Sequence, residues 1–255
     1  MIMIEIVKNT NIDFIGKRRF AFILSGLLLI LGIMALFMIV TGQANMGIDF
    51  VGGAMIMGNF EKPVEVQQLR DALSAEGFGG ADIQKVAGES VQENSFIIRT
   101  IGESETMGDT LITDKIVALI KADFPDNPFH VDSIDEIGSS VGKTLQSQAR
   151  WAVFLALMGI LVYIWIRFDF RFGVAATIAT FHDVLAVLGI YYLTGREISL
   201  LLITALLTLA GYSLTDTVVV YDRIRENLKQ FRKRGDFAST INSSVNEVLS
   251  RTIVT

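Results

Sequence analysis

Four long, mostly apolar stretches decide what this sequence can fold into. The first, residues 20–40, has 21 consecutive residues without a charged side chain. At about 1.5 Å per residue, a helix of that length crosses the roughly 30 Å hydrocarbon core of a bilayer. Three more such stretches follow at 151–166, 172–193 and 198–221. Because 51% of all residues are hydrophobic, the composition agrees with a polytopic α-helical membrane protein.

Basic residues at the ends of these stretches predict their orientation. Arg19 directly precedes the first stretch, and Arg167 and Arg171 lie between the second and the third. The fourth stretch is followed by Arg223, Arg225, Lys229, Arg232, Lys233 and Arg234. Since Lys and Arg are enriched in cytosolic loops, we predict four transmembrane helices with a cytosolic N-terminus, 1–19, and a cytosolic basic and amphipathic segment, 222–255.

The prediction leaves an alternative interpretation near each end of the sequence. A cleaved signal peptide is the rival for residues 20–40, but its apolar core would be only about 7–15 residues long. We therefore expect an uncleaved helix. Near the other end, apolar residues resume at Ile253. Here we expect either the start of a truncated fifth transmembrane helix near Val245 or a segment that stays at the membrane interface.

Residues 41–145 lack long apolar runs and predict a soluble domain on the outer side. The acidic residues concentrate here: residues 41–150 carry 8 Lys and Arg against 17 Asp and Glu. Shorter periodic patterns predict strands and helices in the order β-α-β-β-α-β, at 47–60, 64–78, 81–88, 95–102, 110–124 and 129–138. This order is the split-βαβ, ferredoxin-like pattern. The fold class is therefore a polytopic helical protein with an inserted α+β domain.

Asp216 is the most informative single residue, because it lies inside the fourth stretch, five residues before Tyr221. A carboxylate at membrane depth costs a few kcal/mol or more, so such acids usually face a protein interior or a water path and mark ion routes. Burial disfavours the charged form, so Asp216 would exchange protons near neutral pH, whereas a nearby cation would keep it ionised. We predict that Asp216 is an ion-coupling residue.

A polar stripe accompanies this acid. Thr204, Thr208, Tyr212, Thr215 and Asp216 are spaced by three and four residues, which places them on one side of a helix. One stripe implies one buried face. The structural interpretation is interhelical hydrogen bonding in a packed bundle, and the functional one is that Thr208, Tyr212 and Thr215 support ion coupling.

The third stretch contains adjacent His182 and Asp183. Neighbouring residues diverge by about 100° on a helix, so at most one points squarely at a given partner helix. His titrates near neutral pH, which favours a proton relay. A satisfied polar pair that clamps neighbouring helices is the equal alternative.

Arg251 lies two residues before the apolar onset at Ile253. It would either pair with a membrane carboxylate and shift its titration, or act as a surface residue that sets topology.

Several other chemistries are excluded. The sequence has no cysteine, so it forms no disulfide or thiolate metal site, and no metal is expected. Residues 138–144 resemble a phosphate-binding loop, but only three residues separate Gly138 from Gly142 where the motif needs four. The basic residues outside the acidic region lie beside apolar stretches, which argues against nucleic-acid binding. Asp49, within GIDFVGG, is expected in a strand-and-turn entry to the outer domain.

Five stretches together resemble one family. They are GIDFVGG after the first span, VGKTL before the second, FHDV in the third, GYSLTDTVVVYDRIREN in the fourth, and LSRTIVT at the end. They resemble the SecF subunits of the bacterial SecDF protein-export complex, within the resistance-nodulation-division superfamily. The resemblance covers nearly the whole sequence. It implies a non-enzymatic, six-span protein of the bacterial inner membrane with a periplasmic domain after its first span.

The resemblance also implies roles for single residues. The essential intramembrane aspartate of the family corresponds to Asp216, and the arginine of its LSRT segment corresponds to Arg251. Asp183, beside His182, corresponds to the acid of the third-span HD motif and would have a supporting role. No cofactor is implied beyond a coupling ion, H⁺ or Na⁺. The fifth and sixth spans of the family are missing here, which would leave the Asp216 side of the bundle uncovered.

The partners implied are SecD, the SecYEG channel, the translocating preprotein and the lipid bilayer, with YajC and YidC as further partners. The leading hypothesis is an ion-driven subunit that moves its periplasmic domain during export. Two alternatives stay open: a proton-driven exporter of small molecules or lipids from the same superfamily, and a non-transporting assembly scaffold whose buried acids only hold helices together.

Overall fold

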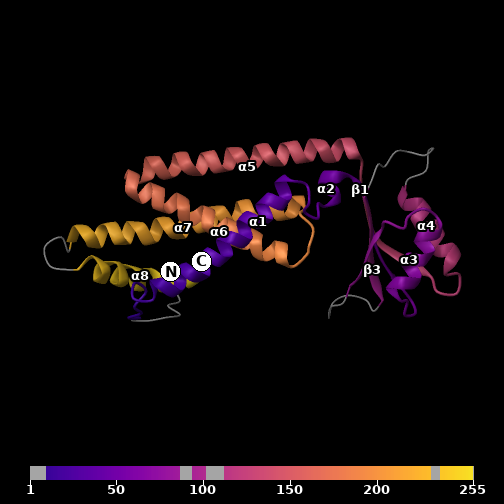
Figure 1. The fold of residues 1–255 in the computed structure, drawn as a ribbon, viewed down its shortest axis with the longest axis horizontal. Coiled ribbons are helices and arrows are strands. Elements are labelled where there is room, and N and C mark those ends of the chain that lie inside the picture. Colours follow the sequence, from indigo (N-terminus) through magenta and orange to yellow (C-terminus); the bar gives the residue numbers. More distant parts are fainter. Residues whose placement is uncertain (1–9, 87–93, 102–111, 231–235, 255) are drawn as a thin grey trace, which may run out of the picture. The chain divides into compact units, whose positions relative to one another are not determined.

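The computed structural model describes residues 10–86, 94–101, 112–230 and 236–254. Arg232, Lys233 and Arg234, which contribute to the predicted orientation, lie outside the described residues. The chain divides into two compact units, which we call the helical unit (1–45, 152–197 and 201–255) and the sheet unit (46–151 and 198–200). Figure 1 labels the helices of both units and two of the strands, β1 and β3.

Among the described residues, four helices are long and apolar enough to cross a membrane. They are α1 (Arg18–Val40), α5 (Ser139–Arg167), α6 (Phe170–Leu193) and α7 (Leu200–Gln230). Each contains most or all of one predicted stretch. Helices α5 and α7 are much longer than the stretches they contain: α5 begins well before Trp151, and α7 continues past Tyr221 into the basic sequence.

Two glycines allow α1 and α6 to pack with their backbones in contact. A Cβ atom on Gly32 of α1 would lie 2.2 Å from the carbonyl oxygen of Leu185. On α6, a Cβ atom on Gly189 would lie 2.6 Å from the backbone nitrogen of Gly32. Small residues at membrane helix interfaces permit this close approach and the van der Waals contacts that come with it.

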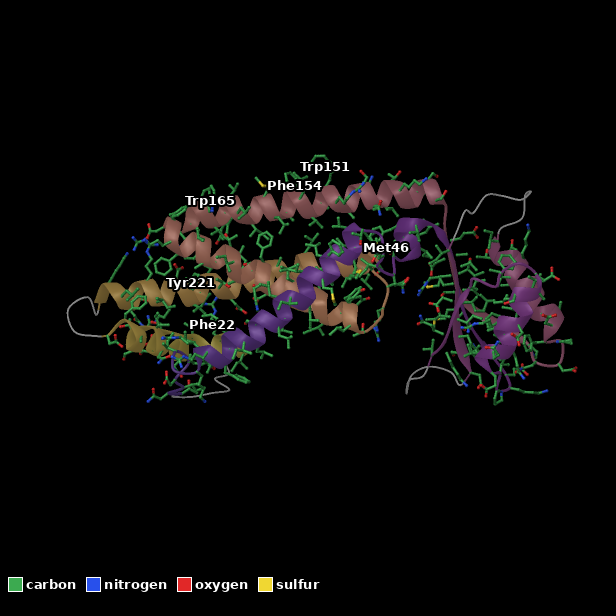
Figure 2. All side chains as sticks on the ribbon, viewed as in Figure 1. Phe22, Met46, Trp151, Phe154, Trp165 and Tyr221 are labelled. Carbon is green, nitrogen blue, oxygen red and sulfur yellow. The ribbon has the colours of Figure 1, made fainter. Side chains whose placement is uncertain are left out.

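Aromatic residues hold the ends of α5, α6 and α7 together. Tyr221 of α7 packs its ring edge-on against Phe168 and Phe172. Other large apolar residues point away from the protein: Phe22 is 72% exposed and Trp165 is 65% exposed, both labelled in Figure 2. Such exposure fits helices whose outer faces contact lipid rather than water.

The sheet unit contains β1 (Gly53–Phe60), α3 (Val66–Ala75), β2 (Asp82–Val86), β3 (Ser95–Ile101), α4 (Ile112–Asp123) and β4 (Phe129–Ile137). The order of these elements matches the predicted β-α-β-β-α-β order. The strands form a sheet in the order β2-β3-β1-β4, and every neighbouring pair is antiparallel.

The core of the sheet unit lies between the sheet and its two helices. Its central ring is Phe60, which is 2% exposed and contacts the rings of Phe96 and Phe129. Leu69 of α3 and Ile116 of α4 belong to the same buried cluster. Helix α3 starts with a capping box between Glu65 and Gln68, which satisfies backbone N–H groups that would otherwise lack a partner.

The prediction of one strand over residues 47–60 is wrong in its first half. Residues 48–51 form a short helix, α2 (Ile48–Val51), and the strand starts only at Gly53. Gly52 and Gly53 have φ values of +79° and +140°, which other residues rarely adopt, so the chain turns sharply here. The turn expected within GIDFVGG is therefore present, but a short helix rather than a strand precedes it.

The helix expected from near Val245 begins earlier in the sequence. A single helix, α8, runs from Phe237 to Val254. In its Ser- and Asn-rich first half, Asn242 and Ser244 bond to other segments of the chain, as described below.

Candidate functional site

A polar cluster joins α6 to α7 within their apolar stretches. The Nδ1 atom of His182 lies 3.0 Å from Oδ1 of Asp183. The hydroxyl of Ser213, on α7, donates a 2.7 Å hydrogen bond to Oδ2 of Asp183. The three side chains therefore form a continuous hydrogen-bonded chain. Asp183 is the member that reaches the neighbouring helix, and His182 contacts it from the preceding position.

Two buried polar atoms beside this chain have no hydrogen-bond partner within the described part of the protein. They are Nε2 of His182 and the hydroxyl oxygen of Thr180, one turn or less along α6. Buried polar groups are normally paired with protein or water, so unpaired ones need an explanation. Both atoms offer hydrogen-bonding partners to a water molecule, and the imidazole nitrogen of His182 is also a group that accepts a proton.

Asp216 lies close to this cluster along α7. It follows Ser213 by three residues, which is a rise of about 4.5 Å along the helix and places both on neighbouring positions of one side. Its side chain is partly buried. The structure thus brings the two predicted acidic positions, on α6 and α7, to the same level of the bundle.

Three members of the polar stripe on α7 are exposed and do not form the predicted buried face. Thr208 and Thr215 are exposed, and Tyr212 is 62% exposed. The hydroxyls of Thr208 and Thr215 donate to the carbonyl oxygens of Thr204 and Gly211, four residues earlier in their own helix. Threonine in a helix readily bonds backward in this way, so a polar stripe does not by itself require a partner helix.

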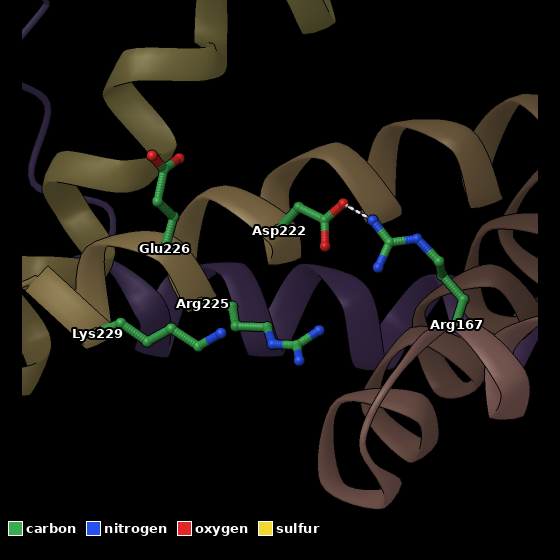
Figure 3. Close-up of a pocket in the computed structure, with 5 residues that line it drawn as sticks. All are labelled: Arg167, Asp222, Arg225, Glu226 and Lys229. Carbon is green, nitrogen blue, oxygen red and sulfur yellow. Dashed lines mark hydrogen bonds and ion pairs between the residues drawn. The ribbon is translucent and has the colours of Figure 1, made fainter.

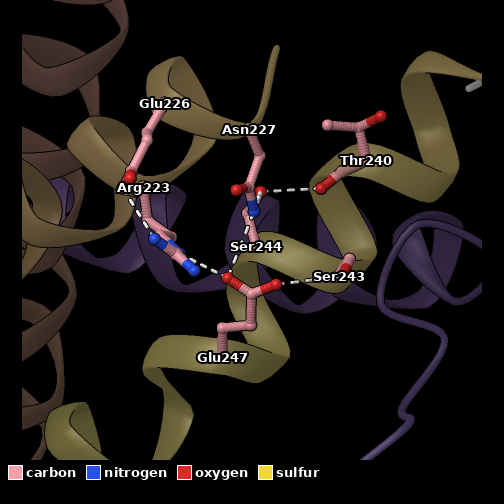
Figure 4. Close-up of polar contacts among 7 residues, drawn as sticks. All are labelled: Arg223, Glu226, Asn227, Thr240, Ser243, Ser244 and Glu247. Atoms are coloured by element: carbon pink, nitrogen blue, oxygen red, sulfur yellow. Dashed lines mark hydrogen bonds and ion pairs between the residues drawn. The ribbon is translucent and has the colours of Figure 1, made fainter. Parts of the chain in front are cut away.

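Arg251 lies in the last turn of α8, and its side chain is exposed. Its helix packs against α7 through a polar network at the basic end of α7, shown in Figure 4. Arg223 forms an ion pair with Glu247 and another with Glu226 at 2.6 Å. Asn227, which is 2% exposed, donates to Ser244 at 3.0 Å and to Glu247 at 3.2 Å.

Glu247 is the acceptor at the centre of this network. Partial burial raises the pKa of its carboxyl, but the hydrogen bonds from Arg223 and Asn227 outweigh that effect. The pKa of Glu247 is therefore lowered from its usual value of 4.5, and the carboxylate is the stable form at neutral pH.

Helix α8 also holds the segment before α1. Asn246 both accepts from the backbone N–H of Ile12 and donates to its carbonyl, each at 2.9 Å. One turn earlier, Asn242 accepts from the N–H of Ile15 at 3.0 Å and donates to Asp13 at 2.8 Å. Two asparagines four residues apart thus hold residues 12–15 through side-chain hydrogen bonds.

The basic ends of α5 and α7 meet at a shallow pocket, shown in Figure 3. It is lined by Arg167, Asp222, Arg225, Glu226 and Lys229. Arg167 and Asp222 form an ion pair across it, and Arg225 lies 3.9 Å from Asp169. The pocket is open and charged, which does not favour an apolar ligand. Across the residues that the structure describes, no group of three or more His, Asp or Glu side chains is arranged to hold a metal ion.

Sequence reasoning missed Ser213 and the α7–α8 network. Ser213 stands in GYSLTD, on the same helix side as Asp216, so its spacing was a usable signal. Asn227 and Glu247 carried no such signal, because their pairing depends on how α8 folds back along α7.

Comparisons with known proteins agree on one family. Residues 120–255 match the family model described as "Protein export membrane protein SecD/SecF, C-terminal". The chain is 46% identical over 254 residues to the protein translocase subunit SecF of Thermodesulfovibrio yellowstonii, covering 99% of this chain and 81% of that protein. It is 38% identical to the SecF subunit of Calditerrivibrio nitroreducens, with the same two coverages of 99% and 81%.

Solved structures give the same result. The fold is similar to the crystal structure of SecDF, a translocon-associated membrane protein from Thermus thermophilus, with a TM-score of 0.77 and 34% identity over 96% of this chain. A structure of SecDF in a super-membrane-facing form matches with a TM-score of 0.60 over 97% of this chain, also at 34% identity. In both cases this chain spans 32% of the solved one.

Proposed function

Since the chain belongs to the SecF protein translocase subunits of the SecD/SecF family, we propose that it couples ion movement through the acids of α6 and α7 to the export of polypeptides. The chain is then a transport component rather than an enzyme. Its working ion sites are Asp216 and Asp183, with His182 beside Asp183 and Arg251 as the cation that tunes them. The sheet unit acts on the translocating polypeptide outside the membrane.

The observation that carries this proposal is the polar chain of His182, Asp183 and Ser213 between two apolar helices. Ionisable groups at membrane depth are costly and mark ion routes. The unpaired Nε2 of His182 offers a further proton-binding atom next to the chain. Because Ser213 bonds to Asp183, protonation of Asp183 would weaken a contact between α6 and α7 and favour a different packing of the two helices.

The available energy fits a conformational step of this kind. One elementary charge that crosses a potential of 100 mV releases about 2.3 kcal/mol. An ion shifts a conformational equilibrium only if it binds the two states with different affinity. Asp216 and Asp183 would therefore have to differ in proton affinity between two arrangements of α6 and α7. H⁺ is the proposed ion because both sites are carboxyls and one adjoins a histidine, and Na⁺ is the alternative.

The sheet unit supports the proposed outer role by its acidity and its topology. We assign it to the ferredoxin-like class, because its element order and its strand order β2-β3-β1-β4 both fit the split-βαβ arrangement. Basic residues at Arg167, Arg171 and Arg225 support a cytosolic position for that end of the helices in the inner membrane. The sheet unit, which follows α1 and precedes the apolar part of α5 along the chain, would then be periplasmic.

The proposed partners follow from the family. SecD is the first, because the matching solved protein is SecDF. SecYEG, the translocating preprotein, YajC and YidC complete the set. The exposed apolar residues of α1 and α5, among them Phe22 and Trp165, support contacts with lipid or with such partners.

Asp216→Asn tests the proposal in cells that carry the complete export machinery. Export of a secreted reporter, its dependence on membrane potential, and recovery of the complex with SecD are scored together. Asp222→Asn is the matched control, because this acid lies on the same helix but in an exposed ion pair at the basic end. We expect Asp216→Asn to lose potential-dependent export while the complex is recovered in full. A parallel loss of complex and export would make the acid structural and favour the scaffold.

A further inference from the structure

Asp49 contacts, within the sheet unit, the residue at which α7 begins. Its Oδ2 atom accepts a 2.8 Å hydrogen bond from the backbone N–H of Leu200, the first residue of α7. The first N–H groups of a helix have no partner within the helix itself. Asp49 supplies one from 151 residues away in the sequence.

Backbone bonds reinforce this contact. The N–H of Gly47 donates to the carbonyl oxygen of Ile198 at 2.9 Å, and Met46 forms a parallel β-bridge with Ile198. Ile198 is 1% exposed. We call residues 46–53 the junction. The junction is therefore bound to Ile198 by a backbone hydrogen bond and to Leu200, the first residue of α7, by a side-chain hydrogen bond.

The junction also contacts the sheet and α5. It continues directly into β1, the strand that pairs with both β3 and β4. A Cβ atom on Gly142 of α5 would lie 3.0 Å from the backbone nitrogen of Gly52. Displacement of the junction would thus be passed to β1, which is hydrogen-bonded to both β3 and β4.

We propose that Asp49 is a positioning residue that transmits displacement of α7 to the sheet unit, an inference that rests on the proposed function. Helix α7 is continuous from Leu200 to Gln230, and Asp216 lies on it. A shift of α7 on protonation of Asp216 moves the N–H of Leu200. Asp49 follows through its hydrogen bond, and β1 follows Asp49.

The absence of cysteine from the sequence makes a direct test possible. Spin labels are attached at Glu76→Cys in the sheet unit and Arg171→Cys at the start of α6, in the full chain bound to a cysteine-free SecD. The distance distribution between the labels is compared with and without Asp216→Asn. The comparison is made in the labelled protein without further changes, which we call the parent. It is repeated in proteins that also carry Asp49→Ala, Asp49→Asn or Asp135→Ala.

We expect Asp216→Asn to change the distance distribution in the parent and to lose that effect in Asp49→Ala. Asp49→Asn should retain it, since the amide oxygen still accepts a hydrogen bond, and so should Asp135→Ala, which removes an exposed acid of β4. An equal change in the parent and in Asp49→Ala overturns the inference and leaves the proposed function standing. No change in the parent overturns the proposed function itself, and the inference falls with it.

Discussion

Asp183 of α6 accepts a 2.7 Å hydrogen bond from Ser213 of α7, and this bond links the two helices that carry the proposed ion sites. The bond lies within the apolar stretches of both helices. It therefore depends on the protonation state of Asp183 and on the packing of α6 against α7 at the same time.

Ser213→Ala should weaken this link and lower export. Interhelical hydrogen bonds in membranes contribute about 0.6–1.7 kcal/mol, so we expect a loss of stability in that range and a clear decrease in the export rate. Both are measured on the complete complex, by thermal unfolding in detergent and by reporter export.

Thr215→Val is the matched control for Ser213→Ala. The Thr215 hydroxyl bonds to the carbonyl of Gly211 in its own helix, so its loss should leave export unchanged. If both variants reduce export equally, the effect comes from hydroxyl loss on α7 in general, and the Asp183 contact has no special role.

The network around Glu247 predicts a pH-dependent stability. The pKa of Glu247 is lowered from its usual value of 4.5, so its contribution is present above about that pH and is lost as the pH falls through the lowered pKa. Glu247→Gln should reduce stability at pH 7 by about 0.5–1 kcal/mol, a value kept small because the pair is partly exposed.

Below the lowered pKa, the parent and Glu247→Gln proteins should have the same stability, since both side chains are then neutral. Thermal unfolding of the two proteins at several pH values checks this convergence. A difference that stays constant into the acidic range would mean that shape rather than charge makes Glu247 important.

The core of the sheet unit predicts a local effect. Phe60→Ala should destabilise this unit by about 3–5 kcal/mol, because the ring is 2% exposed and contacts Phe96 and Phe129. Hydrogen exchange at the amides of β1 and β3 reports the loss. Ile101→Ala, at a 55% exposed position at the end of β3, should leave exchange nearly unchanged. Equal effects of the two changes would argue against a core centred on Phe60.

The long apolar helices and the order of the elements in the sheet unit were predictable, because hydrophobic period and length report on them directly. The cluster on α6 was predictable only as residue types. Sequence placed His182 beside Asp183, but the bond from Ser213 depends on how α6 and α7 align, which no local pattern records.

Asp49 illustrates what local patterns hide. The turn after it was predictable from the glycines, but neither the short helix that contains it nor the bond from the N–H of Leu200 to its carboxylate was. Thr208 and Thr215 mislead in the opposite direction, because a polar stripe suggests a buried face even where each hydroxyl bonds to its own helix. The Asp49 contact was missed because its partner is distant in the sequence. The threonine contacts were misjudged because their hydroxyls bond within α7 instead of to another helix.

Gly32 provides the last prediction, because it tests the close approach of α1 to α6. A Cβ atom there would lie 2.2 Å from the carbonyl oxygen of Leu185, so Gly32→Ala must push α1 and α6 apart and should cost about 1–3 kcal/mol. Gly26→Ala is the matched control on the same helix, since nothing lies within 4 Å of its added Cβ atom. Thermal unfolding of the two variants compares them directly. If neither Gly32→Ala nor Gly26→Ala changed the stability, α1 would not pack on α6 through Gly32. Helix α1 would then not hold α6 in place while α6 moves against α7 as proposed.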